Sequence, residues 1–154
     1  MSTPTPRTFD VFVYGTLLFS EVTTSLGVVS IDESGSELSD VRRTDVVLPG
    51  YERFAVSLRD SANFPAIIPG DGAVHGHLLT RVSEGSLRRL DEFEGVADGY
   101  YSREVVTVMA ATGEHKAFAY VCGAPLRSFL GGAWDPEAFR DRDLLWYLEH
   151  VVRS

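Results

Sequence analysis

Three acidic side chains fall within four consecutive positions of the segment 90–95, which reads LDEFEG. The apolar residues at 87, 90 and 93 predict a helix over 83–93, with Ser83 or, as a second candidate, Ser86 as its N-cap and the acids at its C-terminal end. The helix macrodipole and the mutual repulsion of the acids disfavour full ionisation there. A glutamate whose pKa is raised toward neutrality by burial can accept and return a proton near pH 7. A solvated acidic turn is the alternative, and it is the more usual meaning of clustered acids.

A second candidate site lies where the first predicted strand ends, in the sequence Tyr14-Gly15-Thr16-Leu17. The β-branched and aromatic run 9–14 predicts that strand, and Gly15 turns the chain sharply after it. Because glycine has no Cβ, a ligand can approach the main chain at this point, and backbone N–H groups in such a turn can hold a carboxylate or an oxyanion. The alternative interpretation is that Gly15 only turns the chain and that Tyr14 packs in the core.

The segment 100–104, YYSRE, opens a later predicted strand. Alternation along that strand places Tyr101 and Arg103 on one face. A phenol on this face can donate a hydrogen bond into a site, although tyrosines at the start of a strand more often pack. We expect Arg103 to pair with an acidic side chain.

Other chemistries have little support in the sequence. His75 and His77 share a face of a predicted strand, but no third ligand type stands at a suggestive distance, so we expect no metal site. The patterns of nucleophilic serines and of glycine-rich phosphate loops are absent, and Cys122 has no histidine partner in a recognisable setting.

The composition indicates one compact domain. The chain has 154 residues, 44% of them hydrophobic, and a formal net charge of -8. A negative field repels phosphate backbones and anionic lipids, so we expect neither nucleic acid nor a membrane as a partner. A single cysteine and the lack of a signal-like N-terminal segment suit a cytoplasmic protein. We expect a flexible tail over 1–7 and a single domain over 8–154.

The elements that would position these candidates are mostly short strands. After a polar segment, 30–45, which we interpret as a surface excursion, extended segments are predicted at 46–48, 51–58, 64–68, 74–80, 101–109 and 115–122. Turn residues separate them at 49–50, 60–61, 69–72 and 111–114. An amphipathic pattern predicts a final helix over 136–151.

Taken in order, several segments resemble the γ-glutamylcyclotransferase-like superfamily, and the resemblance covers nearly the whole chain. They are residues 11–17, 48–51, 64–67, 74–78, 90–95 and 100–103. The stretch 132–139 resembles the avirulence-induced-gene-like branch of that superfamily. The resemblance implies an α+β fold, a small mixed β-barrel of about six strands flanked by two or three helices.

The resemblance also implies a catalytic site. The single catalytic glutamate of the family falls on Glu94. The substrate-binding residues would be Tyr14, Gly15, Thr16, Leu17, Tyr101 and Tyr120. Glu94 would take a proton from the α-ammonium of a γ-glutamyl compound, and the amine would attack the γ-carbonyl to give 5-oxoproline and a free amine without a cofactor.

The identity of the substrate and two rival functions stay open at this point. The loop reads Gly-Thr-Leu-Leu, unlike the Gly-Ser-Asn form of the glutathione-degrading cyclotransferase, and it is nearer to enzymes that resemble γ-glutamylamine cyclotransferase, which acts on a γ-glutamyl-ε-lysine adduct. One rival is a non-catalytic protein that binds a small carboxylate or a peptide end, although anion binding gains nothing from Glu94 in the pocket. The other is an interaction module that docks through 30–45 and the C-terminal helix.

Overall fold

The computed structural model describes residues 7–26, 41–56, 64–142 and 144–149 of the chain. The strands of this part are β1 (Thr8–Val13), β2 (Arg42–Val56), β3 (Phe64–Ser83), β4 (Tyr101–Ala110), β5 (Gly113–Cys122) and β6 (Leu130–Gly131). The α-helices are α1 (Ser20–Ser25), α2 (Glu84–Phe93), α3 (Ala124–Arg127), α4 (Pro136–Arg142) and α5 (Leu144–Tyr147). Two 3₁₀ turns, η1 (Thr16–Leu18) and η2 (Val96–Asp98), follow β1 and α2.

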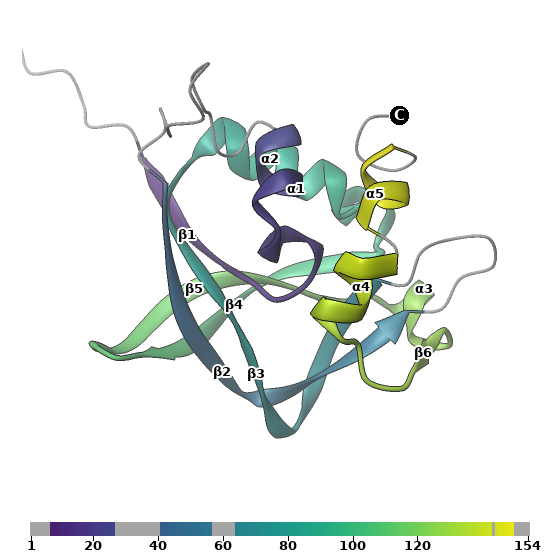
Figure 1. Cartoon of the computed structure of the whole chain (residues 1–154). Coiled ribbons are helices and arrows are strands. Elements are labelled where there is room, and N and C mark those ends of the chain that lie inside the picture. The colour runs from purple at the N-terminus through teal and green to yellow at the C-terminus, as the bar shows by residue number, and fades with distance from the viewer. Residues whose placement is uncertain (1–6, 27–40, 57–63, 143, 150–154) are drawn as a thin grey trace, which may run out of the picture.

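The sheet closes on itself. Its strands are bonded in the order β3-β1-β5-β4-β2-β6, and β3 also pairs with β2, so five strands form a ring and β6 extends β2. The β1–β5 pairing is parallel and the other pairings are antiparallel. Figure 1 shows the long β2 and β3 curving together around the ring. The predicted α+β fold with a small mixed barrel is therefore confirmed, and closure removes most of the unpaired strand edge.

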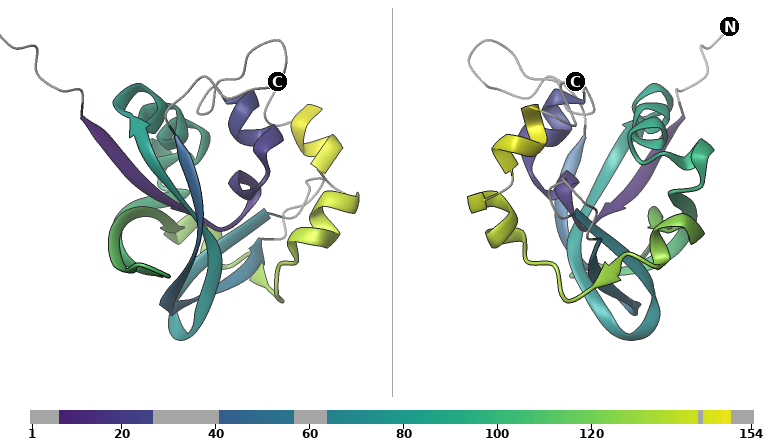
Figure 2. Two further views of the ribbon diagram at one scale, coloured as in Figure 1. Left: turned by 60° about the vertical axis from the view of Figure 1, so that its left-hand side comes forward. Right: turned by 90° about the vertical axis from the view of Figure 1, so that its right-hand side faces the viewer.

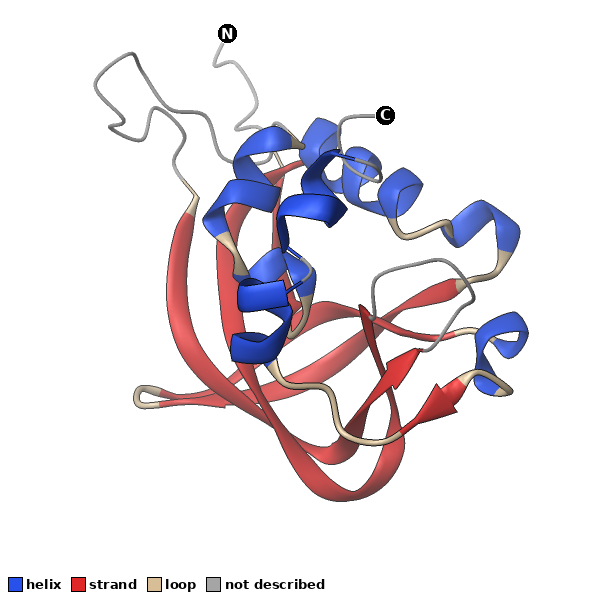
Figure 3. Cartoon of the chain, turned by 45° about the vertical axis from the view of Figure 1, so that its right-hand side comes forward, coloured by secondary structure: helices blue, strands red, loops and turns tan. Residues whose placement is uncertain are grey.

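Two apolar clusters fill the molecule, and alternation along β1 divides its residues between them. Phe12 belongs to a cluster built almost entirely from strand residues, together with Leu48, Ile67 and Val108. Val11 belongs to a second cluster, in which strand residues meet residues of the helices. The helices α1, α2, α4 and α5 gather on one side of the strands, above this second cluster (Figure 3).

The two ends of the described chain meet in this second cluster. In both views of Figure 2, the C-terminal helices lie beside α1. Phe19, which precedes α1, stacks on Phe139 of α4 with 5.5 Å between ring centroids. Phe139 also packs against the buried Trp134, again at 5.5 Å. The cluster therefore fixes α4 and the preceding segment against the start of the chain.

The predicted breaks at 49–50 and 69–72 are wrong as strand ends. β2 and β3 each run through them, and the register shifts between the pairs Pro49–Ala73 and Tyr51–Pro69. Proline and glycine here mark an irregular, bent stretch of a continuous strand pair. Of the expected surface excursion over 30–45, residues 42–45 are exposed as expected, but they belong to the strand β2. Residues 30–40, like the predicted turn at 60–61 and positions 1–6 of the predicted tail, lie outside the described residues.

The helix that carries the acidic residues is confirmed. Ser83 caps α2, and its hydroxyl oxygen accepts a hydrogen bond from the Ser86 N–H at 3.1 Å. Gly95, with a φ of 66°, ends it in the left-handed conformation that favours glycine. The single helix predicted over 136–151 is instead described as α4 and α5, and α1 was not predicted. No helix in the described ranges is long and apolar enough to span a bilayer.

Candidate active site

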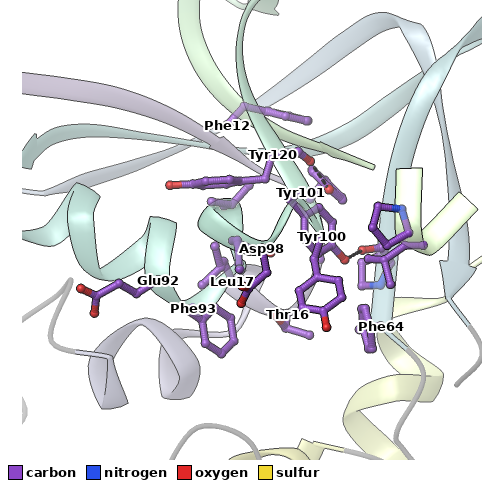
Figure 4. Close-up of a pocket in the computed structure, with 18 of the residues that line it drawn as sticks. Phe12, Thr16, Leu17, Phe64, Glu92, Phe93, Asp98, Tyr100, Tyr101 and Tyr120 are labelled. Atoms are coloured by element: carbon purple, nitrogen blue, oxygen red, sulfur yellow. Dashed lines mark hydrogen bonds between the residues drawn. The ribbon is translucent and has the colours of Figure 1, made fainter. Parts of the chain in front are cut away.

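A cavity of about 570 Å³ lies between the end of β1, the C-terminal end of α2 and the starts of β3 and β4. All the candidate residues predicted from the sequence line it: Tyr14, Gly15, Thr16, Leu17, Glu94, Tyr101 and Tyr120. In the view of Figure 4, Glu92 and Phe93 lie on one side, Tyr100, Tyr101 and Phe64 on the other, and the carboxyl group of Glu92 points away from the other labelled side chains. The fold thus brings together segments that are far apart in the sequence.

Glu94 occupies the C-cap position of α2, where its N–H donates to the Leu90 carbonyl at 2.9 Å. A Cβ on the next residue, Gly95, would lie 2.6 Å from the Tyr100 ring, so only glycine permits this tight turn beside the cavity. The Glu94 side chain is partly buried, and its carboxyl makes no hydrogen bond or ion pair with any other residue of the described ranges. Burial without a partner raises the pKa of Glu94 from 4.5 to about 8.

Asp91 lies one helical turn before Glu94 and has two partners. Its Oδ1 accepts a hydrogen bond from the Tyr120 hydroxyl at 2.8 Å, and its Oδ2 accepts one from Arg103 Nη1 at 2.7 Å. This ion pair confirms the prediction that Arg103 pairs with an acid. Burial and the bond to Asp91 raise the pKa of Tyr120, so its phenol stays protonated with the O–H committed to Asp91.

Two further tyrosines are fixed by hydrogen bonds to the main chain. The Tyr14 hydroxyl donates to the Tyr120 carbonyl, and the Tyr101 hydroxyl donates to the Pro65 carbonyl at 2.8 Å. Burial and, to a smaller extent, the proximity of Glu94 raise the pKa of Tyr14. These phenols therefore shape the wall of the cavity with their protons already engaged, whereas the Glu94 carboxyl has no such partner in the described chain.

The loop after β1 approaches the opposite wall closely. A Cβ at Gly15 would lie 2.2 Å from Pro65 Cγ, so the absence of a side chain is what lets the loop pack against β3. From Thr16 the chain turns into η1, where the Leu18 N–H donates to the Gly15 carbonyl at 2.9 Å. A helical turn leaves its first N–H groups without a carbonyl partner inside the turn, and such groups suit a carboxylate or an oxyanion.

Three residues of the described cavity lining have carboxyl side chains: Glu92, Glu94 and Asp98. No lysine, arginine or histidine belongs to the described lining. An anionic group of a ligand would therefore meet uncharged donors in this part of the lining, such as main-chain N–H groups and hydroxyls, and no cation.

His75 and His77, which share a strand face, lie outside the described cavity lining. His77 Nε2 lies 3.1 Å from Asp45 Oδ1, and His77 Nδ1 lies 2.8 Å from Arg43 Nη1. Burial and the charge of Arg43 lower the pKa of His77. In the described ranges, no group of three or more His, Cys, Asp or Glu residues is arranged to hold a metal ion.

Comparison with known sequences decides the family. The sequence model of the family described as gamma-glutamyl cyclotransferase, AIG2-like, matches residues 11–136. The chain belongs to this AIG2-like family. It is 33% identical over 138 residues to AIG2-like protein C of Arabidopsis thaliana, a match that covers 88% of this chain and 71% of that protein. Protein AIG2 C of the same plant is 28% identical over 145 residues, which cover 91% of this chain and 77% of that protein.

Solved structures share the fold of this AIG2-like chain. The solution structure of an Arabidopsis thaliana protein matches with a TM-score of 0.65 and 23% identity, covering 97% of this chain and 91% of that one. A structure of gamma-glutamyl cyclotransferase matches with a TM-score of 0.59 and 21% identity, covering 75% of this chain and 67% of that one. At these identities the likeness shows the fold alone.

Sequence reasoning missed several residues around this AIG2-like cavity. Asp98 and Phe129 line it from η2 and from the segment after α3, neither of which was predicted as an element. Phe64 and Pro65 line it from the start of β3. Asp91 was seen only as one of three clustered acids; its spacing from Glu94 was visible, but the partners that distinguish it come from β4 and β5.

Proposed function

We propose that this protein is a γ-glutamylcyclotransferase that converts a γ-glutamyl amine or peptide into 5-oxoproline and the free amine, with Glu94 as the general acid and base. The observation that carries the proposal is the Glu94 carboxyl. It faces the cavity without a partner in the described chain, and its pKa is raised to about 8. A carboxyl with a pKa near the working pH can both accept and return a proton.

The reaction then needs only one proton carrier. The Glu94 carboxylate accepts a proton from the α-ammonium of the substrate, and the freed amine attacks the γ-carbonyl carbon of the same molecule. A new N–C bond closes the five-membered lactam, and the bond from that carbon to the leaving nitrogen breaks. Glu94 returns its proton to the leaving nitrogen, then accepts the second proton of the attacking nitrogen and passes it to the departing amine, which leaves as an ammonium ion. Because both reacting groups belong to one molecule, holding the substrate folded supplies much of the acceleration.

The loop at residues 14–17 supplies the complementary half of the proposed site. Its main-chain N–H groups would hold the α-carboxylate of the glutamyl part and the developing negative charge on the γ-carbonyl oxygen. The lack of a cation in the described cavity lining supports main-chain recognition of these groups. The acidic lining also favours a leaving group that carries no further carboxylate, so we expect γ-glutamyl amines to be better substrates than γ-glutamyl amino acids.

The test is release of 5-oxoproline. The purified protein would be incubated with γ-glutamyl-ε-lysine, γ-glutamyl alkylamines, γ-glutamyl dipeptides and glutathione, and 5-oxoproline would be measured by mass spectrometry. Glu94→Gln is the inactive form, and Glu84→Gln is the matched control, because Glu84 is an exposed acid in the first turn of the same helix. We expect release by the wild-type protein and by Glu84→Gln only. Binding of these compounds without release by the wild-type protein would refute the enzyme and favour a non-catalytic binding protein.

A further inference from the structure

We propose that Arg53 is a positioning residue of the cavity: its guanidinium fixes and polarises the peptide group between Tyr14 and Gly15, so that the Gly15 N–H becomes the donor to the anionic end of the ligand. The nature of that ligand rests on the proposed function. The geometry of Arg53 does not depend on it.

Arg53 holds the loop from behind. Its Nη1 donates to the Tyr14 carbonyl at 2.7 Å and makes a longer bond of 3.4 Å to the His75 carbonyl. The first is short for a bond from nitrogen to oxygen, as expected when the donor carries a full charge. Arg53 is absent from the described cavity lining, whereas Tyr14 and Gly15 belong to it. The guanidinium therefore hydrogen-bonds the peptide on the side that faces away from the cavity.

In a trans peptide, a hydrogen bond to the Tyr14 carbonyl also affects the N–H of Gly15. The C=O of Tyr14 and the N–H of Gly15 belong to one planar unit and point in opposite directions. A hydrogen bond to the C=O therefore orients the N–H away from Arg53, and it polarises the unit so that the N–H becomes a stronger donor. Among the described residues, no hydrogen bond from the Gly15 N–H is present. This donor is thus available to a ligand.

Arg53 is itself held in place by an aromatic ring. Its guanidinium carbon lies 5.3 Å from the centroid of the Trp134 ring, which is buried in the second apolar cluster, beneath the helices. A flat guanidinium can lie over an indole and still direct a donor at a carbonyl, whereas an ammonium group keeps the charge without the planar fork. The segment before α4 therefore reaches the cavity indirectly, through Trp134, Arg53 and the Tyr14–Gly15 peptide.

The amide resonance of Gly15 tests the inference directly. Nitrogen-15 spectra would be recorded for the wild-type protein, Arg53→Met, Arg53→Lys and the control Arg42→Met, which removes an exposed arginine from the same strand. We expect the Gly15 amide proton to move upfield in Arg53→Met, to take an intermediate position in Arg53→Lys and to stay in place in the control. Trp134→Phe, which keeps an aromatic ring, would show a smaller shift of the same sign.

Titration with 5-oxoproline, which carries both a carboxylate and a lactam carbonyl, provides a second readout. We expect its addition to move the Gly15 resonance in the wild-type protein, and its affinity to fall about tenfold in Arg53→Met, as for the loss of one hydrogen bond to a charged group. All comparisons would be made at a temperature where thermal melts show each variant to be fully folded. A loss of folding alone would change the Gly15 resonance no more than those of other barrel residues.

Two results would overturn the inference. One is a Gly15 resonance and a 5-oxoproline affinity in Arg53→Met equal to those of the wild-type protein. The other, which applies if Arg53→Met does not fold, is a wild-type Gly15 resonance in both Arg53→Lys and Trp134→Phe. A wild-type protein that neither binds nor releases 5-oxoproline would instead refute the proposed function, and the Gly15 resonance of the free variants would still decide the role of Arg53.

Discussion

Asp91 and Glu94 are carboxylic acids one helical turn apart at the same end of α2, yet their surroundings differ completely. Asp91 accepts hydrogen bonds from Tyr120 and Arg103, at 2.8 Å and 2.7 Å. Glu94 has no such partner in the described part of the chain, and burial raises its pKa to about 8. The first acid joins α2 to the barrel, and the second faces the cavity in a state that can change near neutral pH.

The partners of an acid thus decide its role more than its position in a cluster does. The Asp91 carboxylate is engaged by two donors, whereas a buried carboxyl without donors is stabilised in its neutral form. A structural acid and a proton carrier can therefore stand on one short helix end. Changing one of the two acids, or the pH, should therefore affect them differently.

The largest expected difference is in turnover. Glu94→Gln keeps the shape of the side chain and removes the proton transfer, so we expect 5-oxoproline formation to fall by roughly 10²–10⁴. Asp91→Asn should reduce turnover far less, because Asp91 acts on the cavity only through Tyr120. Steady-state rates of both variants on one γ-glutamyl substrate would measure this. Equal losses of turnover in the two variants would show that Asp91 and Glu94 do not differ in function.

The pH dependence of turnover should report Glu94 alone. Since the base must be ionised in the free enzyme and its pKa is about 8, kcat/KM should rise with pH, by about tenfold for each unit below that value. In the complex, the substrate ammonium favours the Glu94 carboxylate, so the ascending limb of kcat should lie at lower pH. Rates between pH 5.5 and 9 would show this. A rise of kcat/KM centred near the ordinary pKa of glutamate would contradict the role of Glu94 as the base.

The stability of the protein should depend on pH through Glu94. The pKa of this carboxyl is 4.5 unfolded and about 8 folded, so the folded state binds one more proton between those values, and stability is highest below 4.5 and falls up to 8. Glu94→Gln removes this dependence. The free energy of unfolding of Glu94→Gln, minus that of the wild-type protein, should therefore increase by about 2–3 kcal/mol from pH 5 to pH 8. This is less than the pKa shift of Glu94 alone would give, because the side chain is partly exposed.

Urea unfolding at several pH values would measure this gain. Asp91→Asn serves as the control, because it leaves Glu94 in place and should keep the wild-type dependence. If the free energies of unfolding of the wild-type protein and Glu94→Gln change with pH in the same way across this range, the Glu94 carboxyl is not neutral in the folded state.

The smallest expected effect is the structural cost of losing Asp91. Asp91→Asn replaces the charged acceptor of Tyr120 and Arg103, so we expect the free energy of unfolding to fall by about 1–2 kcal/mol near pH 7. Glu94→Gln should not lose stability at that pH. Urea midpoints of the two variants would give opposite signs, and a loss of stability in Glu94→Gln alone would reverse the assigned roles.

Local signals predicted the elements that carry the chemistry. The spacing of apolar residues and a serine cap placed α2 and its acidic end correctly, and Arg103 pairs with an acid as predicted, although the sequence did not name Asp91. Family resemblance then assigned the barrel and selected Glu94 among the three acids. Nothing in the local sequence distinguishes Glu94 from Asp91, since that difference depends on Tyr120, which lies 29 residues after Asp91.

Long-range contacts were beyond local reasoning. Pro49 and Gly50 are typical of strand ends, but pairing between β2 and β3 continues on both sides of them because an irregular register absorbs the bend. Arg53 lies 39 residues from Tyr14, and its contact exists only because β2 passes behind the end of β1. No residue spacing predicts a guanidinium bound to one particular main-chain carbonyl.

Direct titration of the Glu94 carboxyl is the measurement closest to the central claim. Carbon-13 spectra of the side-chain carboxyl groups, with Glu94 assigned by its absence in Glu94→Gln, would be recorded from pH 4 to pH 10 in the free protein. The account predicts a midpoint of about 8 for Glu94. A midpoint near 4.5, the ordinary value for glutamate, would show that this carboxyl is charged at neutral pH and would contradict its assignment as the proton carrier of the cavity.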